Sequence, residues 1–187
     1  MTNYNDNYRM YGLVPYNISE IQKGIQFGHA VQEYNNIYTD GGMSIENRVA
    51  FEEWRRNSKT FIILNGGTTN DNPDSLGTLN LHEKEISKMG IQTALFHEPD
   101  LGDQLTAFVF IVPNTVYDTN VVPDFWDWID TDEMPFSQID TIRLRTGDLY
   151  IEDLNEEQMH FYSQWETAVG GEKYARLKFY LKQFKLA

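Results

Sequence analysis

The sequence predicts an α/β protein in which helices cover a small β-sheet. Short apolar runs alternate with amphipathic segments, and their order over the first 113 residues is strand, helix, helix, strand, helix, strand, strand. Ser19 and Gln22 form the signature of a capping box, which marks the start of the first helix. Strands that are joined through a helix are expected to run parallel.

The first strand and the two helices after it follow from apolar spacing and turn signals. We expect a strand at 8–15, a helix at 19–38 and, after a turn at 39–42, a helix at 44–56. The apolar stripe of the first helix, which should face the core, is Phe27, Val31, Tyr34 and Tyr38. The apolar positions of the second helix are Ile45, Val49 and Trp54.

One further helix and three strands complete this part of the chain. Residues 59–64 form a compact apolar run suited to a buried strand, and a long flexible loop follows at 65–74. A helix at 75–89 is weakened by Gly77 and closed by Gly90. The last two strands are expected at 91–96 and 105–112.

The character of the chain changes after Pro113. Residues 116–133 are rich in aromatic and acidic side chains. The segment 125–128 within it is expected to cover the hydrophobic core; its rings could also stack bases, but the flanking carboxylates make that unfavourable for a polyanion. Residues 139–151 are expected to add a strand or two, and 155–186 form one or two helices interrupted at Gly170 and Gly171. The sequence therefore divides into an α/β domain at 1–113 and a mostly helical extension at 114–187 that packs on it.

Composition excludes several classes of function. The 187 residues contain no cysteine, which removes thiol nucleophiles, Cys-ligated zinc and iron–sulfur clusters. The net charge of −13 argues against non-specific binding of nucleic acid. The N-terminus lacks the pattern of a signal peptide, and the most apolar run, 107–112, is too short to cross a bilayer. We therefore expect a soluble, cytoplasmic protein.

The first helix carries the pattern that most resembles a site. Its polar stripe is Gln22, Gln26, His29 and Glu33. Gly24 and Gly28 have no side chains and would let a backbone or a ligand approach closely, at a cost of about 1 kcal/mol each relative to alanine. A solvated polar face with glycines used for helix packing would show the same spacing, so both interpretations stay open.

A second polar group follows the third strand, at His97, Glu98 and Asp100. It could form an acid–base or ligand-positioning cluster, although an ordinary capped turn has the same composition. We expect His29 and Asp100 to line one cleft at an end of the sheet, with His97 close to His29. The four histidines have no metal-ligand spacing, and no motif for a phosphate loop, dinucleotide or metalloprotease site is present, so no metal and no cofactor are expected.

Several segments together resemble the type 2 peptidyl-tRNA hydrolase family. That family has a first helix reading K-x-A-A-Q-x-x-H-A, and Gln26, His29 and Ala30 match its Gln, His and Ala. Trp54 followed by the apolar run matches the middle of the family. Residues 100–106 resemble its D-A-G-x-T segment, before a closing strand. The resemblance covers residues 8–113 and implies a three-layer domain with a mixed four-stranded sheet.

The resemblance implies a hydrolase that needs no metal and cleaves the ester between a peptide and tRNA. In it, His29 and Asp100 position or activate water, and Lys23 stabilises developing negative charge. The residues that would bind substrate are Gln22, Gln26, Gly28, His97, Glu98, Gln104 and Thr106. Two departures affect function: the family's lysine falls at Gln22, about 100° around the helix from Lys23, and its threonine falls at Gln104 unless Thr106 substitutes.

Two other functions remain open. Because an acidic body repels a long polyanion, the ligand could be a small nucleotide, such as a cyclic dinucleotide immune signal, that the protein cleaves or sequesters. Short proteins of this sort resemble reading frames of phage genomes, where such counter-defence would act in the host cytoplasm. Alternatively, the domain is a non-enzymatic interaction module that uses residues 125–133. Members of the family often pair, and the exposed aromatics would permit a homodimer.

Overall fold

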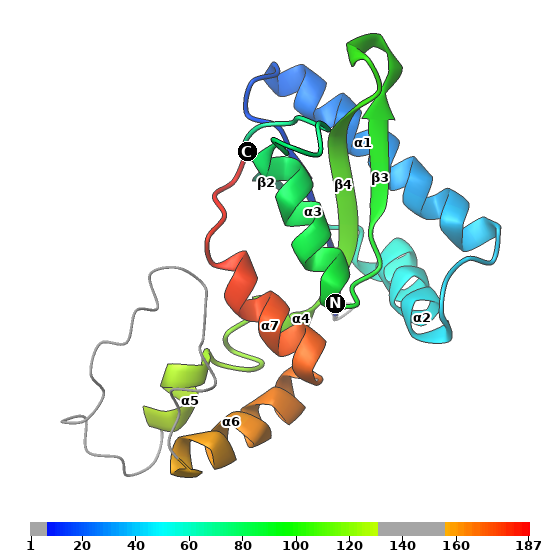
Figure 1. Cartoon of the computed structure of the whole chain (residues 1–187). Coiled ribbons are helices and arrows are strands. Elements are labelled where there is room, and N and C mark those ends of the chain that lie inside the picture. Colours follow the sequence, from blue (N-terminus) through cyan, green and yellow to red (C-terminus); the bar gives the residue numbers. More distant parts are fainter. Residues whose placement is uncertain (1–6, 131–155) are drawn as a thin grey trace. The chain divides into compact units, whose positions relative to one another are not determined.

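The computed structural model describes residues 7–130 and 156–187, which form two compact units (Figure 1). Unit 1 comprises Met1–Pro113 together with Phe184–Ala187, and unit 2 comprises Asn114–Gln183. The strands expected at 139–151 lie outside the described residues. Within the described residues, no helix is both long and apolar enough to span a membrane.

Unit 1 is built on a mixed four-stranded sheet, as predicted, and the order of its strands is β2-β1-β4-β3. The strands are β1 (Tyr8–Val14), β2 (Phe61–Asn65), β3 (Ala94–Glu98) and β4 (Gln104–Pro113). β1 is parallel to β2, and β4 is antiparallel to both of its neighbours. As a result β1, β2 and β3 all finish at the same end of the sheet, which we call the carboxyl edge.

Helices cover both faces of this sheet (Figure 1). They are α1 (Glu20–Thr39), α2 (Ile45–Glu53), the π-helical turn η1 (Trp54–Ser58), α3 (Thr78–Lys88) and the short 3₁₀ turn η2 (Pro99–Leu101). The predicted capping box is confirmed, because the Ser19 side chain accepts the Gln22 backbone N–H and the Gln22 side chain accepts the Ser19 N–H. α1 and α2 pack on one face and α3 on the other.

The main hydrophobic core lies between the sheet and α1. Gly12 of β1 makes the close packing of α1 possible, because a Cβ at that position would lie 2.5 Å from Cε2 of Phe27. The predicted stripe on α1 is confirmed, since Phe27 and Tyr34 are buried and Val31 and Tyr38 pack against the same core. The stripe predicted for α2 is wrong in part.

In α2 the residues that enter the core are Ala50 and Phe51, followed by Trp54 in η1. Ile45 is instead 84% exposed and Val49 is 59% exposed. The apolar spacing identified the helix correctly, but the aromatic rings fill the available space against the sheet, so the face that carries Ile45 and Val49 turns to solvent.

β2 is an edge strand, so the expectation of a buried strand is wrong. Only Leu64 is buried along it, and Phe61 is 48% exposed while packing edge-on against Phe27 and Trp54. The last residues of the chain pair with its outer side. The Asn65 N–H donates to the Lys185 carbonyl at 3.0 Å, and the Ala187 N–H donates to Ile63 at the same distance. This return of the C-terminus is not predicted from the sequence.

The segment between β2 and α3, predicted as a flexible loop, is anchored by hydrogen bonds. Asp71 accepts the backbone N–H of Leu105 at 2.9 Å and also the side-chain amide of Asn80. The Asp71 N–H in turn donates to Oε1 of Gln104 at 3.2 Å, and the Thr69 hydroxyl donates to the Leu105 carbonyl. The loop is therefore tied to the beginning of β4.

Unit 2 is helical in its described part. It contains α4 (Asn114–Tyr117), α5 (Phe125–Asp130), α6 (Glu156–Val169) and α7 (Glu172–Leu181). The predicted interruption is confirmed, because Gly170 and Gly171 both adopt positive φ angles between α6 and α7. The aromatic core of this unit is formed by Phe125, Tyr162, Trp165 and Phe179.

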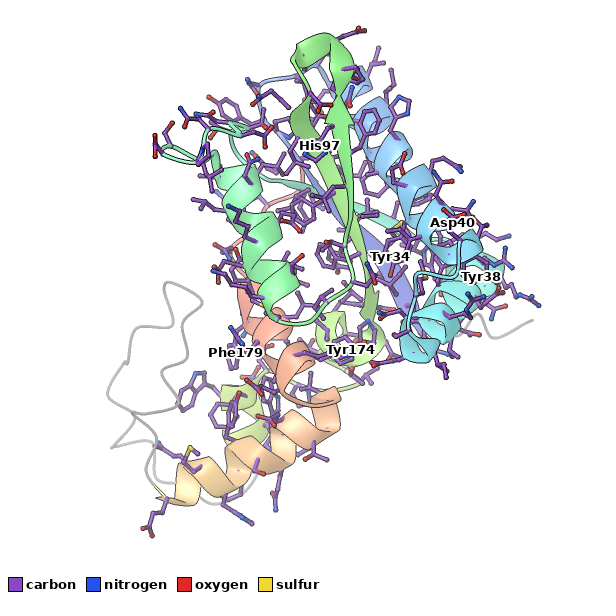
Figure 2. The ribbon with its side chains drawn as sticks, turned by 45° about the vertical axis from the view of Figure 1, so that its right-hand side comes forward. Tyr34, Tyr38, Asp40, His97, Tyr174 and Phe179 are labelled. Carbon is purple, nitrogen blue, oxygen red and sulfur yellow. The ribbon has the colours of Figure 1, made fainter. Side chains whose placement is uncertain are left out.

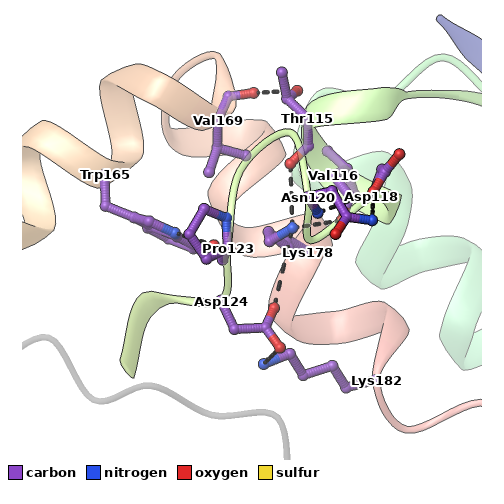
Figure 3. A network of polar contacts seen from close by, with 10 residues as sticks. All are labelled: Thr115, Val116, Asp118, Asn120, Pro123, Asp124, Trp165, Val169, Lys178 and Lys182. Carbon is purple, nitrogen blue, oxygen red and sulfur yellow. Dashed lines mark hydrogen bonds and ion pairs between the residues drawn. The ribbon is translucent and has the colours of Figure 1, made fainter. Parts of the chain in front are cut away.

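A buried lysine ties α7 to the beginning of unit 2 (Figure 3). The Lys178 ammonium donates to the backbone carbonyls of Thr115 at 3.2 Å and Val116 at 2.9 Å. Burial lowers the pKa of Lys178, and the nearby Asp124 carboxylate opposes that shift. Asp124 also forms an ion pair with Lys182 at 2.9 Å. The charge is thus paired and hydrogen-bonded, as a buried charge must be.

Candidate functional site at the carboxyl edge

Gln26 is the centre of a buried chain of polar side chains at the carboxyl edge. It lies on the core-facing side of α1 and is 7% exposed. Its Nε2 donates to Oε2 of Glu98 at 2.6 Å, and its Oε1 accepts the Thr106 hydroxyl at 2.7 Å. Residues from α1, β3 and β4 therefore meet here, and both ends of the Gln26 amide are occupied.

A shift in strand register aims Thr106 at this site. Phe96 of β3 pairs with Ala107 of β4, whereas His97 pairs with Leu105, so Thr106 is the extra residue on β4. Without this bulge, strict alternation would place Thr106 on the opposite face from Ala107, which packs in the core under α1. The bulge turns the hydroxyl toward Gln26 and fixes it there.

Glu98 forms the outer end of this series of hydrogen-bonded side chains. Its Oε2 is bound to Gln26, and its Oε1 lies 3.5 Å from the backbone nitrogen of Asp100, at the start of η2. The residue is half-buried, whereas Asp100 is exposed on the turn. Glu98 is therefore a carboxylate with one oxygen firmly bonded and the other close to the surface.

Lys23 lies one helical turn before Gln26 on α1. It is 9% exposed, and its ammonium forms an ion pair at 2.9 Å with Oε1 of Glu20, whose side chain is 79% exposed. An exposed partner of this kind contributes little to stability. The Lys23 ammonium can therefore exchange Glu20 for another anion without a large cost.

His29 lies one turn after Gln26, on the exposed side of the boundary between α1 and β3. Its imidazole stacks on the ring of Phe96, with 4.4 Å between ring centroids and an angle of 18° between the planes. His97 is exposed near the end of β3 (Figure 2). Within residues 7–130 and 156–187, no hydrogen bond or ion pair joins His29 to Asp100.

The remaining predicted site residues have other surroundings. Gln22 takes part in the capping box, and Gln104 accepts a hydrogen bond from Asp71 of the anchored loop. A Cβ at Gly24 or Gly28 would have no atom within 4 Å other than its own helix, so no other part of the described chain uses the space above them. The structure thus brings together Gln26, Glu98 and Thr106, with Lys23 beside them.

Two neighbours of this site were not selected from the sequence. Phe96 supports His29, and its position directly before His97 was an available signal. Glu20 pairs with Lys23, at the i,i+3 spacing of helical ion pairs. The role of Phe96 depends on a tertiary contact with α1, whereas the pair of Glu20 and Lys23 lies within α1 and follows from local spacing.

Charge at the carboxyl edge is strongly acidic. Between residues 15 and 23, 65 and 77, and 98 and 104, Lys23 is the only Lys or Arg. The acidic residues of these segments are Glu20, Asp71, Asp74, Glu98, Asp100 and Asp103. No group of three or more His, Asp or Glu side chains in the described part of the chain is arranged to hold a metal ion.

A comparison with protein-family models found no match to the chain, and a comparison with curated proteins found no significant similarity.

Proposed function

We propose that unit 1 is a hydrolase that cleaves a nucleotide-linked ester at the carboxyl edge of its sheet. The observation that carries this proposal is the chain Thr106–Gln26–Glu98, in which a buried hydrogen bond fixes Gln26 and a part-buried one joins Gln26 to the Glu98 carboxylate. Gln26 and Thr106 are separated by 80 positions and come from two different motifs of the resemblance to the type 2 peptidyl-tRNA hydrolases. Their direct contact supports that resemblance.

The chemistry assigned to this arrangement is general-base hydrolysis. Glu98 accepts a proton from a water molecule whose oxygen attacks the carbonyl carbon of the ester. The bond from that carbon to the ribose oxygen breaks, and the ribose oxygen takes up a proton. Lys23 leaves Glu20 and stabilises the negative charge that develops on the carbonyl oxygen. Gln26 and Thr106 are positioning residues, because both ends of the amide are bonded within the protein.

The other residues have supporting roles in this proposal. The backbone N–H of Asp100 donates to Oε1 of Glu98, and Asp100 helps to position the water. His29 presents the outer face of its ring, because Phe96 occupies the inner face. A nucleobase can stack on an aromatic surface of this type, with a contribution of about 1–3 kcal/mol.

The charges of the edge favour a small substrate over a whole tRNA. Lys23 is the only basic residue of the three connecting segments at the edge, and Lys185, whose carbonyl accepts the N–H of Asn65 at the end of β2, adds a second, so each phosphate brought there meets mostly carboxylates. That repulsion accumulates along a long polyanion but is limited for a ligand with one to three phosphates. The same observation favours a second candidate function, in which the protein sequesters a small nucleotide signal without cleaving it.

The test compares an aminoacyl ester of a mononucleotide with peptidyl-tRNA as substrates. Glu98→Gln keeps the shape of the side chain and removes the base, so we expect kcat to fall at least about 100-fold while the ester still raises the melting temperature. Asp74→Asn is the matched control, because it removes one carboxylate from the exposed loop outside the chain of hydrogen bonds. Wild-type turnover that Glu98→Gln leaves intact would refute the mechanism.

A cyclic dinucleotide serves as the probe for the second candidate function. If it stabilises the wild-type protein and is recovered unchanged, the sequestering function replaces the hydrolase. If neither ligand is bound or consumed, both candidate functions are rejected.

A further inference from the structure

A second concentration of charge lies around η1, at the opposite end of α1 from the site described above. Four of the 15 Lys and Arg residues of the chain fall between positions 48 and 59. They are Arg48, Arg55, Arg56 and Lys59, and we call them the basic turn. The protein has a net charge of −13, and the structure shows how this concentration of positive charge is held together.

Tyr38 at the end of α1 holds two of these cations in place. The Cζ atoms of Arg48 and Arg55 lie 4.8 Å and 5.0 Å from the centroid of its ring. Arg48 also donates to the Tyr38 carbonyl at 3.3 Å. Two guanidinium groups are therefore fixed within about 10 Å of each other, although like charges repel.

Among the residues that the structure describes, Glu52 is the carboxylate bonded to the basic turn. Glu52 accepts from Nη2 of Arg55 and from Nε of Arg56, both at 2.7 Å, and from the Tyr38 hydroxyl. The hydrogen bond from Arg55 is the main reason that the pKa of Glu52 lies below its usual value. Glu52 thus binds two of the four cations, Arg55 and Arg56.

The other carboxylates of α2 lie on a different flank of the helix. Burial raises the pKa of Tyr8, and the charges of Glu46 and Glu53 raise it further. Glu46 and Glu53 are seven residues apart and so share one side of the helix, away from the side of Arg48 and Glu52. Residues 46–59 thus carry four cations against three carboxylates, and Glu52 is the carboxylate that is bonded to the arginines.

Lys59 closes η1 in a strained conformation. Its backbone is left-handed, with φ 53° and ψ 18°, and its N–H donates to the Trp54 carbonyl at 2.9 Å. For a residue with a Cβ this conformation costs about 1–2 kcal/mol. Across the described residues, the Lys59 ammonium has no hydrogen-bond or ion-pair partner. π-helical turns of this kind often occur at functional sites.

We propose that the basic turn binds a phosphoryl group. Arg55 and Arg48 supply guanidinium donors that are already ordered by Tyr38, and Lys59 supplies an ammonium without a partner of its own. Guanidinium forks match the geometry of phosphate oxygens, and a pre-ordered site loses little conformational entropy on binding. α1 has 20 residues and therefore spans about 30 Å, so this site is separate from the carboxyl edge.

Inorganic pyrophosphate is the first probe, with binding measured by isothermal titration calorimetry on the full chain. The double variant Arg55→Gln/Lys59→Gln is expected to weaken binding at least about tenfold, which corresponds to about 1.4 kcal/mol. Lys84→Gln/Lys88→Gln on α3 removes the same two charges from exposed positions elsewhere, and it should leave the affinity nearly unchanged. Equal losses in both double variants, or no binding by the wild-type protein, would overturn the proposal.

Two single variants separate binding from folding. Lys59→Gly relieves the left-handed strain, so it should raise the melting temperature while it lowers the affinity for pyrophosphate. Glu52→Gln releases Arg55 and Arg56 from their carboxylate and should tighten binding severalfold. If Glu52→Gln weakens binding instead, the arginines are structural and the proposal fails.

A parallel titration with a short single-stranded RNA identifies the source of the phosphoryl group. Tighter binding of RNA than of pyrophosphate, lost in the same double variant, assigns the site to a phosphodiester chain. Weaker binding of RNA assigns it to the terminal phosphates of a small molecule. Neither outcome depends on turnover at Glu98, so failure here is distinguishable from failure of the proposed hydrolase.

Discussion

Replacement of Thr106 by valine tests the buried chain of hydrogen bonds most directly. Valine keeps the branched shape that suits a strand and removes only the hydroxyl. Thr106 is completely buried and Gln26 is 7% exposed, so water does not readily replace the lost donor. The Thr106 hydroxyl also lies 3.4 Å from the Phe96 carbonyl, but a hydrogen bond of that length is weak, so its loss adds little to the effect of the substitution.

The magnitude follows from the group that is left behind. The Gln26 carbonyl oxygen loses its partner in a buried position, and an unsatisfied buried acceptor costs about 1–3 kcal/mol. For a unit of about 100 residues, each kcal/mol lowers the melting temperature by about 4–8 °C. Because Gln26 also positions Glu98, the proposed hydrolase should lose kcat in the same variant, with a smaller effect on KM.

Hydrogen–deuterium exchange of peptides from β4 reports on unit 1 without interference from unit 2. Thr93→Val is the matched control, since the Thr93 hydroxyl is bonded to Glu83 and Ser87, which are not buried. We expect Thr106→Val to lower the free energy of unfolding of unit 1 clearly more than Thr93→Val does. In a double-mutant cycle with Gln26→Leu, the coupling should be about 1 kcal/mol or more. A cost below about 0.5 kcal/mol, or strictly additive effects, would refute the reasoning.

Three further predictions concern stability. Gly28→Ala should raise the free energy of unfolding by about 0.5–1 kcal/mol in calorimetry, because its Cβ would meet no neighbouring atom; a loss would show that the helix is distorted there. Lys178→Met should lower the free energy of opening of α7, measured by hydrogen–deuterium exchange, by about 1–3 kcal/mol, because the Thr115 and Val116 carbonyls lose a buried donor. Unchanged exchange in α7 would contradict that role of Lys178. Burial lowers the pKa of His82, so the unfolded state binds its proton first and unit 1 should lose stability as pH falls below about 6.5. Urea unfolding across that pH range checks this, and His82→Gln should flatten the dependence.

Local signals in the sequence predicted where several helices begin and end. The capping box at Ser19 and the spacing of Phe27 and Tyr34 placed α1, because both depend on neighbours within a few positions. The glycines 170 and 171 likewise marked the break between α6 and α7, since both adopt a backbone conformation that other residues avoid. Such features require no knowledge of distant contacts.

Features that depend on strand pairing or on packing against the sheet could not be predicted in the same way. The apolar run of β2 has the composition of a buried strand, yet its place at the edge depends on which strands pair with β1. The exposure of Ile45 and Val49 depends on Phe51 and Trp54 filling the core. In each case two arrangements satisfy the local pattern, and packing against the sheet selects one of them.

The candidate site shows the same division. The sequence selected Gln26, Glu98 and Thr106 as separate candidates from their types and motifs. It gave no indication that Gln26 lies between the other two, because the contact with Thr106 depends on a bulge of one residue in β4. Gln22 and Gln104 carry the same amide group, but one caps α1 and the other holds the Asp71 loop.

The sequence by itself therefore determined the fold class, the helix starts and breaks, and the acidic character of the surface, because spacing, caps and charge act over short range or simply add. Only the tertiary structure decided which polar side chains share a buried position and which cations share one aromatic ring. Those groupings depend on strand order and register, where a shift of one residue moves a side chain to the other face of the sheet.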